Sequence, residues 1–162
     1  MIQKNQNHIL ELILDQGHVP VSYISSLLRT LQAAIREVAV NSENTRSYFD
    51  KQPQPTLVLI SIVSDKQISM CLGFEDPINK KNLPTLSENT FSTFLDKLSE
   101  FVMSLPQPSL WGGAARKSST NPESEMSNRM DQVYAELRRA NKVNLKFKTR
   151  SIEIEGDRFE IF

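Results

Sequence analysis

Hydrophobic and polar positions along this chain alternate in blocks that predict nine secondary-structure elements. The first block, residues 8–15, has a leucine at every second position, as in a strand with one buried face. A helix would also give these residues an apolar stripe. A block this short, closed by Gln16 and Gly17, suits a strand better. We therefore expect a strand here and keep a helix as the alternative.

Three later segments carry apolar residues at the three- and four-residue spacing of an amphipathic helix. The first has Ser22 as a suitable N-cap and ends near residue 41. The second has Ser87 or Asn89 as its cap and stops before Pro106. The third has Asn121 as its cap and continues to the basic residues that follow. These segments predict three helices.

Two apolar runs, residues 56–63 and 67–74, are rich in β-branched side chains. The short polar segment between them predicts a β-hairpin. Because residues 56–63 are apolar at nearly every position, we expect this run to be the more central strand of the two. Residues 143–162 return to strand-like alternation, with a Gly-Asp pair as a further hairpin turn.

The resulting order, β-α-β-β-α-α-β-β-β, predicts an α+β fold with a mainly antiparallel sheet of about five or six strands and three helices packed on it. A length of 162 residues, 39% of them hydrophobic, suits one domain with a substantial core. We expect residues 1–162 to form that single domain. Flexible connectors are expected near residues 41–55 and 106–121, where prolines and polar residues gather.

Charge and cysteine content limit the classes of partner. The 19 basic and 19 acidic side chains cancel, so no overall field favours a nucleic acid or a membrane. No segment approaches the ~20 consecutive apolar residues of a membrane-spanning helix. The polar N-terminal residues lack the features of a secretory signal, and the single cysteine, Cys71, cannot form an internal disulfide. We expect a cytoplasmic protein with no membrane partner.

The residue types that carry most enzyme chemistry are scarce. The chain has two histidines, His8 and His18, and neither has a neighbour at zinc-ligand spacing. Cys71 lies in an apolar run with no basic neighbour that would activate its thiol. We therefore expect no catalytic residue, no metal and no cofactor. A small hydrolase-like site near Asp15 and His18 is the third-ranked hypothesis.

One stretch of the sequence is strongly basic: residues 138–150 hold six basic side chains and no acidic one. If residues 143–149 form a strand, Lys142, Lys146, Lys148 and Arg150 lie on one side of it. We favour a solvated outer face, which the acidic residues that follow could neutralise. Contact with phosphates is the functional alternative.

The preferred hypothesis is a non-catalytic protein–protein interaction or assembly module, either an accessory subunit of a larger complex or a homo-oligomer. A nucleic-acid-binding protein that uses residues 138–150 is the alternative, possible but not favoured. Self-association is expected through the sheet edge formed by the apolar C-terminal residues. The candidate partner-binding residues are Trp111, Arg116, Lys117, Lys142, Lys146, Lys148, Arg150 and Phe162.

Overall fold

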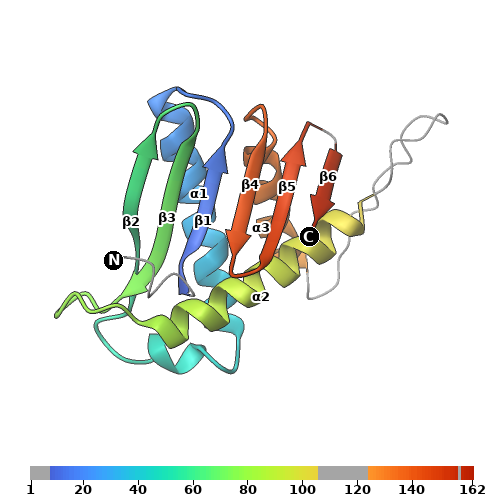
Figure 1. The fold of residues 1–162 in the computed structure, drawn as a ribbon. Helices are drawn as coiled ribbons and strands as arrows, with labels where there is room; N and C mark the ends of the chain where they lie inside the picture. The colour runs from blue at the N-terminus through green and yellow to red at the C-terminus, as the bar shows by residue number, and fades with distance from the viewer. Residues whose placement is uncertain (1–7, 106–123, 157) are drawn as a thin grey trace.

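The structure, a computed structural model, describes residues 8–105, 124–156 and 158–162 (Figure 1). It confirms the predicted α+β class and the predicted order of strands and helices. The elements are β1 (Leu10–Leu14), α1 (Val21–Asn41), the short 3-10 helix η2 (Arg46–Phe49), β2 (Thr56–Ser64), β3 (Ile68–Glu75), α2 (Pro84–Met103), α3 (Ser124–Leu137), β4 (Val143–Phe147), β5 (Arg150–Glu155) and β6 (Arg158–Ile161).

The six strands form one sheet in the order β2-β3-β1-β4-β5-β6, and every neighbouring pair is antiparallel. One face of the sheet is covered: α1 and α3 lie behind the strands in Figure 1, and α2 runs along their lower ends. The opposite face is the uncovered face. Alternate residues of β1, β3, β4 and β5 are buried toward the helices, as a sheet with one covered face requires.

The strand interpretation of residues 8–15 is confirmed. Leu10, Leu12 and Leu14 are fully buried on the helix side of β1. This strand is hydrogen-bonded to β3 on one side and to β4 on the other, so the N-terminal block lies in the middle of the sheet.

Residues 56–63 occupy a different place from the one predicted. They form β2, which pairs only with β3 and is the outermost strand of the sheet. An apolar run without polar alternation is typical of a strand covered on both faces. Here it belongs to an edge strand, and much of its apolar surface is in contact with solvent.

The predicted helix caps are also wrong for α1 and α2. α1 begins after Pro20, and no side chain caps it; the amides of Tyr23 and Ile24 donate to the carbonyl of Pro20. α2 begins at Pro84, three residues before the expected Ser87. Ser87 is instead fully buried inside the helix, where its hydroxyl accepts a hydrogen bond from the backbone N–H of Phe74 at 2.9 Å. That bond ties α2 to β3.

Aromatic rings connect the layers near this bond. Phe74 of β3 stacks on Phe91 of α2 with ring centres 5.9 Å apart, and Phe91 meets Phe147 of β4 edge to face. Phe49 of η2 packs edge-on against Phe74, so a buried ring lies within the predicted connector near residues 41–55. These contacts hold η2, α2 and the covered face of the sheet in one core.

A polar contact fastens α1 to α3. The hydroxyl of Tyr23 donates to the backbone carbonyl of Glu136 at 2.7 Å, and the hydroxyl of Ser26 donates to the carboxylate of Glu136 at 2.7 Å. The guanidinium of Arg139 lies 4.9 Å from the centre of the Tyr23 ring. Burial, and secondarily the negative charge of Glu136, raises the pKa of Tyr23 from 10.0 to about 12.

Replacing Ser87 with alanine should destabilise the fold, because the buried N–H of Phe74 would lose its acceptor. We expect the free energy of unfolding to fall by about 1–3 kcal/mol. Urea denaturation measures it. Ser99→Ala is the matched control, because the Ser99 hydroxyl oxygen is buried on α2 without a partner among the described residues. Its removal should leave the free energy of unfolding unchanged or slightly higher, and an equal loss in both variants would contradict the assignment.

The raised pKa of Tyr23 predicts a loss of stability in alkali. The folded state holds the proton up to about pH 12, whereas the unfolded chain releases it near pH 10.0, so this contribution is complete below pH 10.0 and falls as the pH rises toward 12. Its slope is at most about 1.4 kcal/mol per pH unit. The stability difference between the wild type and Tyr23→Phe should therefore shrink from about pH 9 to about pH 11.5 in urea titrations. A stability difference that stays constant over this range would refute the linkage.

Candidate functional site

The outer edge of β2 carries the largest group of exposed apolar side chains on any strand of the described structure. Leu59 and Ile60 are each 43% exposed, Ile62 is 52% exposed and Val63 is 60% exposed. No charged residue occurs between Thr56 and Ser64. We call this strand, with its unpaired outer backbone and its exposed side chains, the β2 edge.

Apolar side chains of the β2 edge lie on both faces of the sheet. Leu59 and Ile62 pair with the buried residues Leu72 and Met70 of β3, so they lie on the helix side. Val63 pairs with Ser69 and lies on the uncovered face. On the helix side the helix layer does not reach far enough to bury Leu59 and Ile62, and Val63 lies on the face that the helices leave uncovered.

A β-bulge interrupts the strand at Ile60. Leu59 pairs with Leu72 and Ser61 with Cys71, so Ile60 is an extra residue with no partner on β3. A Cβ placed on Gly73 would lie 2.8 Å from the Cδ1 of Ile60, so the end of the Ile60 side chain packs over this glycine on the uncovered face. Ile60 and Ser61 therefore both lie on the uncovered face, in succession, where a regular strand would alternate.

The other edge of the sheet differs in character. β6 is four residues long, and Arg158 and Glu160 place charges on it. Of the apolar C-terminal residues, Phe159 pairs with Ile154 and is half-buried, whereas Phe162 is 65% exposed. A short, charged strand is a common means of discouraging edge-to-edge pairing.

The basic residues 138–150 are largely occupied by partners within the chain. Lys142 forms an ion pair with Glu153 at 3.5 Å. Lys148 pairs with Glu88 of α2. Arg139 pairs with Glu136 at 3.1 Å, while Arg138 lies over the Tyr134 ring and Arg150 pairs with Asp96 at 2.6 Å. Lys146 has no ion pair with the described residues.

The prediction that these residues share one face is wrong for Lys148 and Arg150. β4 ends at Phe147, and Lys148 lies in the turn with a positive φ of 56°. Arg150 starts β5 opposite Phe147, whose side chain is buried toward the helices. Arg150 therefore points to the helix side, where it also donates to the backbone carbonyl of Ser92. Of the basic residues in the segment 138–150, Lys142 and Lys146 are the ones that line a shallow hollow of about 150 Å³ on the uncovered face.

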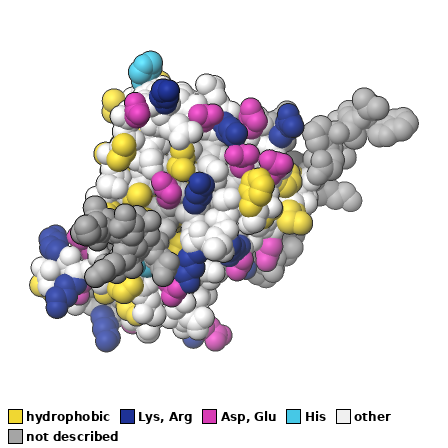
Figure 2. Space-filling view, viewed as in Figure 1, with side chains coloured by type: hydrophobic (Ala, Val, Ile, Leu, Met, Phe, Trp, Pro, Cys, Tyr) yellow, Lys and Arg dark blue, Asp and Glu magenta, His cyan; other side chains and the backbone are white. Residues whose placement is uncertain are grey.

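On that uncovered face, acidic and basic side chains are interspersed over β4, β5 and β6 (Figure 2). The hollow there is lined by Asp15 and Glu153 as well as by the two lysines. The positive charge of this region is therefore offset locally, within a few ångströms, where screening by salt is least effective.

Among the described residues, those considered for catalysis form no hydrogen bond or ion pair with one another. Asp15 and His18 are both exposed, and the Asp15 carboxylate accepts a hydrogen bond from the side-chain amide of Gln67. His8 is buried and Cys71 is half-buried on β3. Among residues 8–105, 124–156 and 158–162, no three His, Cys, Asp or Glu side chains come together as metal ligands would.

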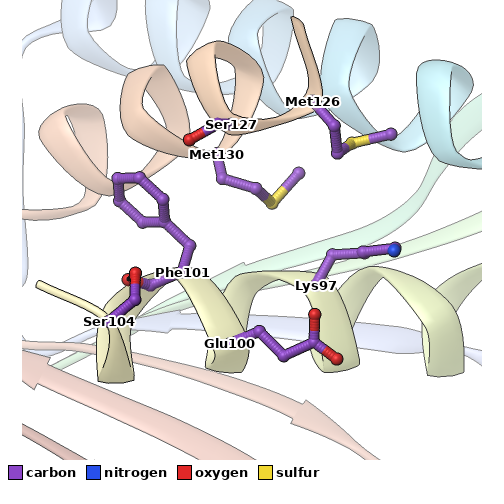
Figure 3. A pocket seen from close by; sticks show the side chains of 7 residues that line it. All are labelled: Lys97, Glu100, Phe101, Ser104, Met126, Ser127 and Met130. Carbon is purple, nitrogen blue, oxygen red and sulfur yellow. Dashed lines mark hydrogen bonds between the residues drawn. The ribbon is translucent and has the colours of Figure 1, made fainter. Parts of the chain in front are cut away.

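A groove of about 250 Å³ lies between α2 and α3 (Figure 3). The side chains of Phe101, Met126 and Met130 line it, together with the polar residues Lys97 and Glu100 of α2. Both helices lead from this groove into residues 106–123, which lie outside the described residues. The candidate partner-binding residues Trp111, Arg116 and Lys117 fall in that segment.

No helix in the described part of the chain combines the length and the apolar character needed to cross a lipid bilayer. Neither a protein-family model, nor a curated protein sequence, nor a solved structure matches the chain. Any functional inference therefore depends on the surfaces described above. The β2 edge is the most distinctive of them, and it contains no residue singled out from the sequence.

The ion pairs of the basic segment predict weak binding of nucleic acid. Four phosphate contacts would give log affinity a slope of roughly −3 to −4 against log salt on duplex DNA. Because most of these side chains already have partners, we expect no saturable binding of mixed DNA or RNA below about 10 µM at ~150 mM salt. Filter binding at two salt concentrations tests this. Sub-micromolar affinity that falls steeply with salt, and disappears in a folded Lys146→Ala, Lys148→Ala, Arg150→Ala variant, would contradict it.

Proposed function

We propose that this chain is a non-catalytic cytoplasmic module for protein–protein association, acting as an accessory subunit or as a homo-oligomer, and that the β2 edge is its docking element. The observation that carries the proposal is the exposure of Leu59, Ile60, Ile62 and Val63 on a strand whose outer backbone is unpaired. The compartment is proposed from the lone cysteine, which has no partner in the chain for a disulfide.

An unpaired strand edge offers hydrogen-bond donors and acceptors at regular intervals to an incoming strand. On the β2 edge those groups are accompanied by apolar side chains on both faces, so a docked strand would also bury hydrophobic surface. The backbone groups would orient the incoming strand, and the burial of apolar side chains would contribute a favourable free energy of binding. Exposed edges without a partner usually carry a lysine, a proline or an inward-pointing charge, and residues 57–64 contain none of these.

The distribution of charge supports the same function. On the β4–β5 side, the side chains of Lys148 and Arg150 are engaged by acidic residues of α2. The β2 edge, in contrast, is apolar and neutral. An apolar, neutral surface suits a protein partner better than the phosphate backbone of a nucleic acid.

Capture experiments with a charged β2 edge test the proposal. Tagged wild type, Ile62→Lys and Ile78→Lys are exposed to extract of the native cells. Ile78 is a matched control because it is 72% exposed in the loop after β3, away from the β2 edge. Each retained protein, including any untagged copy of this chain, is then purified. Its dissociation constant is measured with the wild type, with Ile62→Lys and with Ile78→Lys. We expect Ile62→Lys to weaken binding more than roughly tenfold, because a lysine would have to enter an apolar interface, while Ile78→Lys binds as the wild type does. A result in which no retained protein distinguishes the two variants would refute the proposal.

A further inference from the structure

We propose that the β2 edge is occupied by β2 of a second copy of this chain, paired antiparallel about a two-fold axis normal to the sheet and passing between Ile60 and Ser61. This proposal rests on the proposed function, since it names the partner of the same docking element. Because of the bulge, the order of side-chain faces along β2 differs from that of a regular strand but agrees with that of a second, antiparallel β2.

The faces of β2 follow an irregular order because of the extra residue. From Leu57 to Leu59 the side chains lie on the helix side, the uncovered face and the helix side. Ile60 and Ser61 both lie on the uncovered face, and alternation then resumes with Ile62 on the helix side. A regular incoming strand alternates throughout, so it matches these faces on one side of the bulge and falls out of step on the other.

A second copy of β2, running in the opposite direction, carries the same irregularity at the same place. Read from 57 to 64 or from 64 to 57, the order of faces is identical. The two-fold axis brings the extra residues opposite each other, so every pair of facing residues shares a face. This register places Leu59 opposite the partner's Ile62 on the helix side and Val58 opposite the partner's Val63 on the uncovered face.

Charge is compatible with this pairing. No charged residue lies between Leu57 and Ser64, so no like charges are brought together near the axis. Asp65 and Lys66, which begin the turn into β3, would face Thr56 and Pro55 of the second copy. A strand with acidic or basic residues would gain no complementary charge on β2.

The size of the contact sets its strength. Nine residues of β-strand extend about 30 Å, and a strip about 10 Å wide gives roughly 300 Å² for each copy. Standard stable interfaces bury about 800 Å² for each partner. We therefore expect a reversible dimer with a dissociation constant in the micromolar range, held by backbone hydrogen bonds and by the paired apolar side chains.

Sedimentation across a concentration series tests the dimer. The wild type should pass from 18.5 kDa toward twice that mass as its concentration rises from about 1 to about 200 µM. Ile62→Lys and Val63→Lys each place a lysine in the contact, on opposite faces of the strand, and either variant that stays folded by circular dichroism should weaken dimerisation more than roughly tenfold. The control Ile78→Lys should dimerise as the wild type does. A wild type that remains at 18.5 kDa throughout would overturn the inference.

The register is tested by a single cysteine near the axis. With strands about 4.8 Å apart and the two copies of position 61 offset by about one residue, their Cα atoms would lie about 6 Å apart, within the range of a disulfide. In a Cys71→Ser background, Ser61→Cys should yield a covalent dimer under mild oxidation. The exposed Ser47 of η2 provides the control Ser47→Cys. Equal cross-linking at both positions would overturn the register.

The two proposals fail in different ways. The wild type could stay monomeric but bind a different purified protein, with that binding lost in Ile62→Lys. This result would refute the second copy as the partner and would support the docking role of the β2 edge. A monomer with no partner sensitive to Ile62→Lys refutes both. A dimer that Ile62→Lys and Val63→Lys leave intact refutes the β2 edge as the interface.

Discussion

An open antiparallel sheet must leave the outer backbone groups of its first and last strands unpaired, and this constraint governs the surface of the protein. The two edges meet the constraint differently. β6 is short and carries Arg158 and Glu160. β2 is nine residues long, and its side chains from 57 to 63 are neutral and mostly apolar. This difference between the two edges is the reason for assigning the proposed association to the β2 edge.

The packing of the helices accentuates that difference. On the β4–β5 side, α2 reaches the sheet with Glu88 and Asp96, which bind Lys148 and Arg150. These bonds use the positive charge of the basic segment for internal contacts. On the β2 side, the aromatic core ends at β3: Phe74 is buried, whereas Leu59 on the next strand is 43% exposed. The hydrophobic layer therefore extends one strand beyond the helices that cover it.

The sequence alone was sufficient to predict the elements and their order, because each has a distinct periodicity. Leucines at every second position of residues 8–15 specified a strand, and its central position followed only from pairing with both β3 and β4. The edge position of β2 could not be predicted. An all-apolar strand is expected in a sheet covered on both faces, and a hairpin can join a sheet through either of its strands; the bonds between β1 and β3 decide which.

The β2 edge could not be predicted as the candidate site for the same reason. The faces of the basic residues 138–150 were predicted wrongly because of one turn. An apolar run gives no indication of whether a helix covers it. The two-residue turn after Phe147 places Arg150 on the helix side, although alternation from Lys142 would have placed it on the uncovered face. Ser87 was mistaken for a helix cap because serine hydroxyls often cap helices. The same hydroxyl can instead accept a hydrogen bond from a buried backbone N–H of a neighbouring strand, as it does here from Phe74. Long-range contacts of this kind have no signal in sequence spacing.

The bulge at Ile60 gives the proposed dimer its closure. A neutral apolar edge with regular alternation could accept many strands, including successive copies in a growing sheet. The extra residue restricts good pairing to a strand with the same irregularity, and in the proposed two-fold arrangement the side-chain faces of the two copies match from residue 57 to residue 64. The edges left over are the two β6 strands, which are short and charged. An isologous contact of this kind ends at two chains, because the surface that recognises a partner is the surface that the partner covers.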